Sequence, residues 1–158
     1  MARTQAQQIK LPAGRRRLAE EKCKELGERL TPARLSAYAE IVRSDGPLSA
    51  YELIARLEER ENRKIAPLTV YRHLDFLKRV GLVHRLESKQ AFVACEHPDH
   101  VHESQYLLCS DCGRAEEMES EQLLKLLNKL SDQQGFVPAH AVVEITGQCR
   151  DCHQQARD

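Results

Sequence analysis

The chain has 158 residues, of which 41% are hydrophobic and 30% charged, and it contains no tryptophan. This length suits one core, or two small cores that share an interface. No apolar run approaches the ~18 residues that a membrane span requires, and the first residues lack the apolar stretch of a signal peptide. We therefore expect a cytoplasmic protein that has no membrane partner.

The formal net charge of zero conceals two halves of opposite sign. Residues 1–86 carry 18 Lys and Arg against 11 Asp and Glu, whereas residues 87–158 carry 6 against 13. A basic half joined to an acidic half suggests that the first half binds a polyanion. The alternative is that two solvated surfaces differ by accident.

The basic half has the pattern of a helical segment. Apolar residues recur at near-helical spacing across residues 18–30. Thr31 and Pro32 are typical of an N-cap and a first helical position, so a second helix should begin there. Ser49 should cap a third helix, with Glu52 three residues later completing a capping box.

A fourth helix is predicted over residues 68–80, and two alternating runs at 82–87 and 90–95 predict a β-hairpin after it. Gly81 should end this helix. Its apolar face comprises Val70, Leu74, Leu77 and Val80.

Helices followed by a hairpin indicate a winged helix-turn-helix, whose second motif helix enters the DNA major groove. Here that helix is residues 68–80, and its N-terminal end presents Thr69, Tyr71, Arg72 and His73. Arginine suits bidentate contact with guanine, and Tyr or Thr can reach phosphates or base edges. Tyr71 could instead be a core aromatic residue with a solvated hydroxyl. The triplet at residues 15–17, Arg15, Arg16 and Arg17, could be a solvated face or a phosphate contact.

The acidic half predicts a small α/β domain. Residues 104–111 and 114–119 read as strands, residues 120–135 as a helix, and residues 136–149 as a final strand. The predicted fold class is therefore α+β, with an N-terminal winged helix-turn-helix domain and a small α/β domain. Because a domain of that size buries little core, a zinc ion and a dimer partner would both help to stabilise it.

Two C-x-x-C pairs, Cys109 with Cys112 and Cys149 with Cys152, are separated by 36 residues. In a reducing cytoplasm, paired motifs of this kind indicate a structural zinc ion bound by four thiolates. A dithiol redox switch is the alternative. A thioredoxin-like enzyme would instead place one such motif at the start of a helix within a βαβ unit.

The segments "RLTPAR", "TVYRHLDFL", "GLVHRLES", "FVAC", "CSDCG" and "CRDC" resemble the ferric uptake regulator superfamily, from about Arg17 to the end. Within it, "LSAYELI", the helix-and-wing segment and "FVAC" most resemble the zinc uptake regulators. The resemblance implies a homodimeric, metal-dependent repressor. It implies a winged-helix domain over residues 1–94, with 1–16 a flexible arm, a ligand-bearing hinge at 95–104, and a dimerisation domain at 105–158.

The resemblance also assigns metal ligands. It gives the four cysteines to structural zinc, and a second, regulatory zinc to His84, Cys95, His102 and Glu117, so that each subunit binds two Zn²⁺ ions. Two neutral imidazoles, one thiolate and one carboxylate neutralise Zn²⁺ and suit its tetrahedral preference. Glu116 could replace its neighbour. A further site could use His97, His100 and His140.

The departure of "HPDHVHES" from the histidine-rich run of iron sensors favours zinc over iron. The implied mechanism is that zinc closes the hinge so that the dimer fits double-stranded operator DNA near zinc uptake genes. Tyr51 and Arg72 would read bases, and Arg34 and Tyr71 would be weaker candidates for the backbone. An iron- or peroxide-sensing regulator is the nearest alternative, followed by a thiol redox enzyme and a zinc-containing interaction protein. We expect neither catalysis nor a small-molecule substrate.

Overall fold

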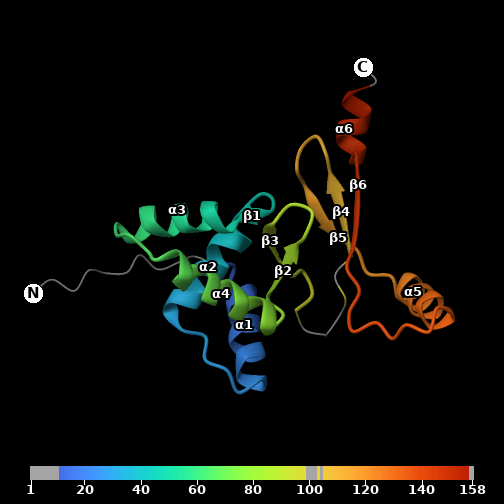
Figure 1. Ribbon diagram of the computed structural model, residues 1–158. Helices are drawn as coiled ribbons and strands as arrows, with labels where there is room; N and C mark the ends of the chain where they lie inside the picture. Colours follow the sequence, from blue (N-terminus) through green and yellow to red (C-terminus); the bar gives the residue numbers. More distant parts are fainter. Residues whose placement is uncertain (1–10, 99–102, 104, 157–158) are drawn as a thin grey trace, which may run out of the picture. The chain divides into compact units, whose positions relative to one another are not determined.

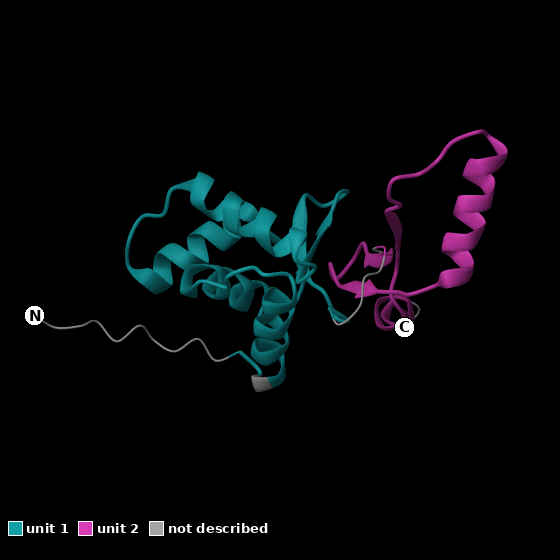
Figure 2. Cartoon of the chain, turned by 90° about the horizontal axis from the view of Figure 1, so that it is seen from below, with its two compact units in different colours: residues 1–99 teal, residues 100–158 magenta. Residues whose placement is uncertain are grey.

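A computed structural model describes residues 11–98, 103 and 105–156, and the chain divides into two compact units, residues 1–99 and 100–158 (Figure 2). The division falls within the segment predicted as a hinge, residues 95–104. The domain limits drawn from the sequence, at residues 94 and 105, remain predictions. His100 and His102 lie outside the described residues.

Four helices form most of the first unit: α1 (Ala13–Glu25), α2 (Pro32–Val42), α3 (Ala50–Glu61) and α4 (Pro67–Arg79) (Figure 1). Helix α1 begins five residues before the predicted start, so it includes residues 13–16 of the segment expected to be an arm. Pro12 precedes the helix, and its carbonyl accepts the backbone N–H of Arg15 at 2.9 Å. The part of the arm at residues 1–10 lies outside the described residues.

Side-chain caps fix the starts of α2 and α3 as the sequence predicts. Thr31 Oγ1 accepts the Arg34 backbone N–H at 3.4 Å. Ser49 Oγ accepts the Glu52 N–H at 3.2 Å, and the Glu52 carboxylate accepts the Ser49 N–H at 2.8 Å, which completes the capping box. Each cap pairs a backbone group that the first helical turn leaves without an intrahelical partner.

The wing is a three-stranded antiparallel sheet in the order β1–β3–β2. Strands β2 (Val83–Leu86) and β3 (Ala91–Ala94) form the predicted hairpin. Strand β1 (Leu48–Ser49) was not predicted: it has two residues, and it pairs with Phe92 and Ala91 far along the chain. With this sheet, the first unit is the predicted winged helix-turn-helix.

One hydrophobic core joins the helices to the wing. The predicted apolar face of α4 is buried, because Val70, Leu74, Leu77 and Val80 are at most 1% exposed. Further core residues come from the other helices and the wing: Ala19, Cys23, Ala37, Tyr38, Ile41, Leu48, Leu53, Leu57, Leu82, Val83 and Phe92. Cys23 thus packs in the core. This packing holds α4 against the unit while its opposite face stays exposed.

The second unit contains β4 (Gln105–Cys109), β5 (Ala115–Glu117), α5 (Glu121–Gln133), β6 (Val143–Gly147) and α6 (Arg150–Gln155). Its sheet has the order β5–β4–β6, with β4 antiparallel to β5 and parallel to β6. The predicted strand at residues 136–149 is shorter than expected. Helix α6 was not predicted, because its six residues begin inside the second C-x-x-C motif. The α+β fold class is confirmed.

Among the described residues, no helix is both long and apolar enough to cross a membrane.

Candidate functional site

The sheet of the second unit brings the two C-x-x-C motifs together. Cys109 ends β4, and Cys112 follows it in a tight turn. Cys149 is the N-cap of α6, and Cys152 lies within that helix. Because β4 and β6 run parallel, with Cys109 opposite Gly147, both motifs leave the same end of the sheet.

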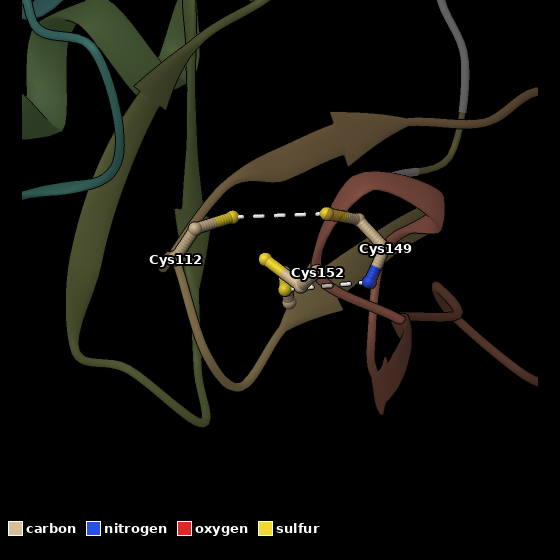
Figure 3. Close-up of side chains that lie close together, drawn as sticks. Cys112, Cys149 and Cys152 are labelled. Carbon is tan, nitrogen blue, oxygen red and sulfur yellow. Dashed lines mark hydrogen bonds between the residues drawn. The ribbon is translucent and has the colours of Figure 1, made fainter. Parts of the chain in front are cut away.

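The four sulfur atoms lie within 4.8 Å of one another, and the Sγ atoms of Cys112 and Cys149 are 3.9 Å apart (Figure 3). A disulfide requires about 2.05 Å. Tetrahedral zinc with bonds of about 2.3 Å places its sulfur ligands about 3.8 Å apart. All six cysteines lie in the described residues and none forms a disulfide. The geometry of this cluster therefore fits a four-thiolate zinc ion.

The surroundings of the sulfur atoms favour the thiolate at Cys109 and the neutral thiol at Cys152. The pKa of Cys109 is lowered to about 6, mainly by backbone N–H groups of Cys112, Cys149 and Asp111. The Cys149 N–H donates to Cys109 Sγ at 3.3 Å. Hydrogen bonding with Cys149, followed by burial, raises the pKa of Cys152 to about 12. A metal ion could therefore bind the thiolate of Cys109 first and displace the protons from the other thiols as they join it.

A cationic side chain links the two motifs. Arg114 follows the first motif, and its guanidinium pairs with Asp151 of the second motif at 3.3 Å. The pKa of Arg114 is raised by Asp151 first, and then by Cys149 and Cys112. A zinc ion with four thiolates carries a net charge of −2, so a neighbouring guanidinium would stabilise it. Arg114 was not singled out from the sequence, although its place directly after "CSDCG" could have indicated a cation beside the cysteine cluster.

A second group of side chains that could bind a metal ion lies in and directly after the wing. His84 of β2 is opposite Val93 in the register, and Cys95 follows two residues later, so both side chains belong to the same face of the hairpin. Their ligand atoms lie within 4.8 Å of each other. Cys95 is fully buried and His84 half-buried. An imidazole and a thiolate at this separation suit Zn²⁺.

The remaining sequence-predicted ligands do not all lie in one unit, and two of them, His100 and His102, lie outside the described residues. Glu117 is half-buried in β5 opposite Tyr106, and its neighbour Glu116 lies opposite Leu107. His97 and His140, proposed for a further site, are exposed and belong to different units. The full regulatory ligand set and the further site stay predictions.

The predicted DNA-reading residues lie on the exposed side of α3 and α4. Tyr51, in the first turn of α3, is 78% exposed, and Tyr71 of α4 is 42% exposed and therefore not a core residue. Thr69 and Arg72 are also exposed. Arg34 differs, since its guanidinium stacks on the Phe76 ring at 3.6 Å. The sequence did not predict this cation–π contact, because its partners are far apart in the chain.

Comparison with known proteins places the chain. The model of the ferric uptake regulator family matches residues 25–146. The zinc uptake regulation protein of Escherichia coli K12 is 38% identical over 135 residues, which cover 85% of this chain and 78% of that protein. A ferric uptake regulation protein of Synechocystis is 32% identical over 127 residues, 78% of this chain and 76% of that protein.

Solved structures agree with the sequence comparisons. A zinc uptake regulator complexed with zinc and DNA has a TM-score of 0.87 and 34% identity, and the match covers 94% of this chain and 100% of that chain. The crystal structure of holo XcZur has a TM-score of 0.81 and 40% identity, and the match covers 87% of this chain and 96% of that chain. The chain therefore belongs to the ferric uptake regulator family.

Proposed function

We propose that this protein is a zinc-responsive, DNA-binding transcriptional repressor that acts as a homodimer on zinc uptake genes. The observation that carries the proposal is the His84–Cys95 pair on the wing of a DNA-binding fold. The thiolate in this pair favours zinc over iron or manganese, because soft sulfur ligands select the softer ion. Relatives that share 34–40% identity are named as zinc uptake regulators, which supports the same conclusion.

Each subunit would bind two zinc ions in different roles. Cys109, Cys112, Cys149 and Cys152 would hold the first ion, which stabilises the second unit. His84 and Cys95, with His102 and Glu117, would hold the second ion, which acts as a Lewis acid that joins four ligands. Because these ligands come from both units, the arrangement in which they converge binds zinc better, and its population rises with zinc concentration.

DNA recognition would depend on the exposed N-terminal ends of α3 and α4. The side chains of Arg72 and Tyr51 are exposed rather than packed in the core, so they can approach base edges. Thr69 and Tyr71 are exposed nearby on α4 and suit phosphate or base contacts. A dimer would present two such helices to successive major grooves only at one spacing, and that spacing would require the metal-bound arrangement.

The second unit offers the surface that a dimer would bury. Helix α5 has no buried residue, although it carries leucines at helical spacing. Leu126 and Leu130 are 50% and 49% exposed, and Ile145 on β6 is 49% exposed. Exposed apolar side chains on so small a unit are typical of a subunit interface.

The function is tested by measuring zinc content and DNA binding on the same samples, before and after mild chelation. We expect two zinc ions per chain, one lost easily together with specific DNA binding, and recovery of binding with zinc but not with ferrous iron. One tightly held ion, with recovery by iron alone, would favour an iron-sensing regulator. DNA binding that chelation leaves unchanged would contradict metal-dependent repression.

A matched pair of variants tests the second site. Cys95→Ala should lose the weaker zinc ion and the zinc dependence of DNA binding. Cys23→Ala removes an equally buried thiol from the same unit, since the two cysteines are 0% and 1% exposed, and should keep both. Equal behaviour of the two variants would remove Cys95 from the site.

A further inference from the structure

We propose that Arg15, in the first turn of α1, is a positioning residue for the regulatory metal site, because it holds the backbone of Cys95 in place. This inference rests on the proposed function, in which Cys95 is a zinc ligand. It gives α1, which lies outside the recognition motif and the wing, a role in the metal response.

The backbone of Cys95 is held on both sides. Its carbonyl accepts a hydrogen bond from Arg15 Nη1, across 80 positions of sequence. Its N–H donates to the carbonyl of Leu82, just after α4, at 3.0 Å. The side chain of Cys95 is fully buried. Helix α1 and the turn after α4 thus fix the residue between them.

The surroundings make the Arg15 bond stronger than an ordinary surface contact. Arg15 is half-buried, and its positive charge acts on the fully buried Tyr38 of α2. Burial raises the pKa of the Tyr38 hydroxyl, and the positive charge of Arg15 opposes that rise. A hydrogen bond from a charged donor in a partly desolvated site is about twice as strong as one between neutral groups.

The neighbouring arginines provide an internal comparison. Arg16 and Arg17 instead form surface ion pairs with Glu20 at 2.9 Å and Glu21 at 3.3 Å, one helical turn later. Their side chains are 56% and 81% exposed. Of the basic triplet, therefore, Arg15 contacts Cys95, and the other two lie on the solvated face of α1.

Holding the Cys95 backbone should matter for metal binding because it limits where the sulfur atom can be. His84 is positioned by its strand pairing in β2, whereas Cys95 lies one residue beyond the end of β3. Groups that orient a ligand from behind commonly change metal affinity 10- to 100-fold when removed. Arg15 supplies that orientation here.

The test uses full-length protein with its tightly held zinc in place. Arg15→Met keeps an unbranched apolar stem and removes the donor, and Arg16→Met is the matched control. We expect Arg15→Met to weaken the second zinc, measured by chelator competition, by about 10- to 100-fold, and Arg16→Met to change it less than about 2-fold. Arg15→Lys retains a charged donor and should recover part of the loss.

One further readout and one further comparison separate positioning from a general loss of stability. Alkylation of Cys95, followed by peptide mass spectrometry without zinc, should be faster in Arg15→Met, because local opening exposes this buried thiol more often. If Arg15→Met unfolds, the comparison of Arg15→Lys with wild type still decides, with weaker zinc binding expected. Zinc affinities equal to wild type in the Arg15 variants would overturn the inference. A wild-type protein that binds no second zinc would instead overturn the proposed function.

Discussion

At the scale of single residues, some arginines on and around α4 can reach DNA, whereas others are held in contacts within the first unit. Arg72 is exposed, whereas Arg34 of α2 stacks on Phe76, and the Arg79 guanidinium lies 5.5 Å from the centroid of the same ring. Arg79 also pairs with Glu28. These contacts hold the C-terminal part of α4, so its N-terminal part is the one available for recognition.

Arg72→Ala should therefore reduce the preference for operator over unrelated DNA, by about 1–3 kcal/mol if Arg72 makes a bidentate contact with guanine. Zinc affinity should not change. The measurement is a competition titration at fixed salt concentration. Arg63→Ala, which removes an exposed arginine outside the helices, is the control. An unchanged preference in Arg72→Ala would exclude Arg72 from base reading.

His73 of α4 predicts a pH effect. Its pKa is lowered by burial, and secondly by the charge of Arg34, while Glu61 opposes the shift. The unfolded chain therefore binds this proton more readily, and stability should fall as pH drops below about 6.5, the ordinary value for histidine. Urea unfolding of His73→Gln should show a smaller loss between pH 7 and pH 5 than wild type. A difference between the two proteins that does not vary with pH would contradict this.

At the scale of elements, local signals explain what the sequence could predict. Caps, prolines and apolar periodicity lie within a few residues of each helix start, so α2, α3, α4 and the hairpin were predictable. Strand β1 was not, because its two residues are defined by pairing with Phe92 and Ala91. The cysteine cluster was predictable from spacing, but the Arg15–Cys95 bond, 80 positions apart, has no local signal.

Helices α2 and α3 are joined by an ion pair between Glu40 and Arg60, whose side chains are only 11% and 16% exposed. Removing one partner leaves the other charge poorly solvated, so Arg60→Met should destabilise the first unit by about 3 kcal/mol. Glu40→Met with Arg60→Met should recover most of that loss. Denaturant unfolding of both single variants and the double variant measures the coupling. Additive losses would show that the pair is not coupled.

At the scale of the whole molecule, α5 predicts the state of association. Leu126→Glu places a charge on the exposed apolar face of this helix and should convert the dimer to a monomer, because a buried unpaired carboxylate opposes association. Lys129→Glu, at another exposed position of α5, is the control and should remain dimeric. Sedimentation equilibrium distinguishes the two results. A dimeric Leu126→Glu would place the interface elsewhere.

The two units differ in how much core they possess, and this difference predicts how they respond to loss of metal. In the described residues, the core cluster lies entirely in the first unit, whereas the buried residues of the second are confined to β4. A unit with so little buried apolar surface depends on other constraints, and the four-cysteine cluster links the end of β4 to the end of β6 at one end of the sheet.

Removing the tightly held zinc with a strong chelator under reducing conditions should therefore unfold residues 105–156 and leave residues 11–98 folded. Hydrogen exchange resolved by peptide measures this directly: amides of β4 and β6 should lose protection, while those of α2 and α4 keep it. Cys112→Ser should give the same pattern without chelator, and Ser110→Ala, in the same turn, should not. Loss of protection in both units together would mean that the first unit depends on the second for its stability.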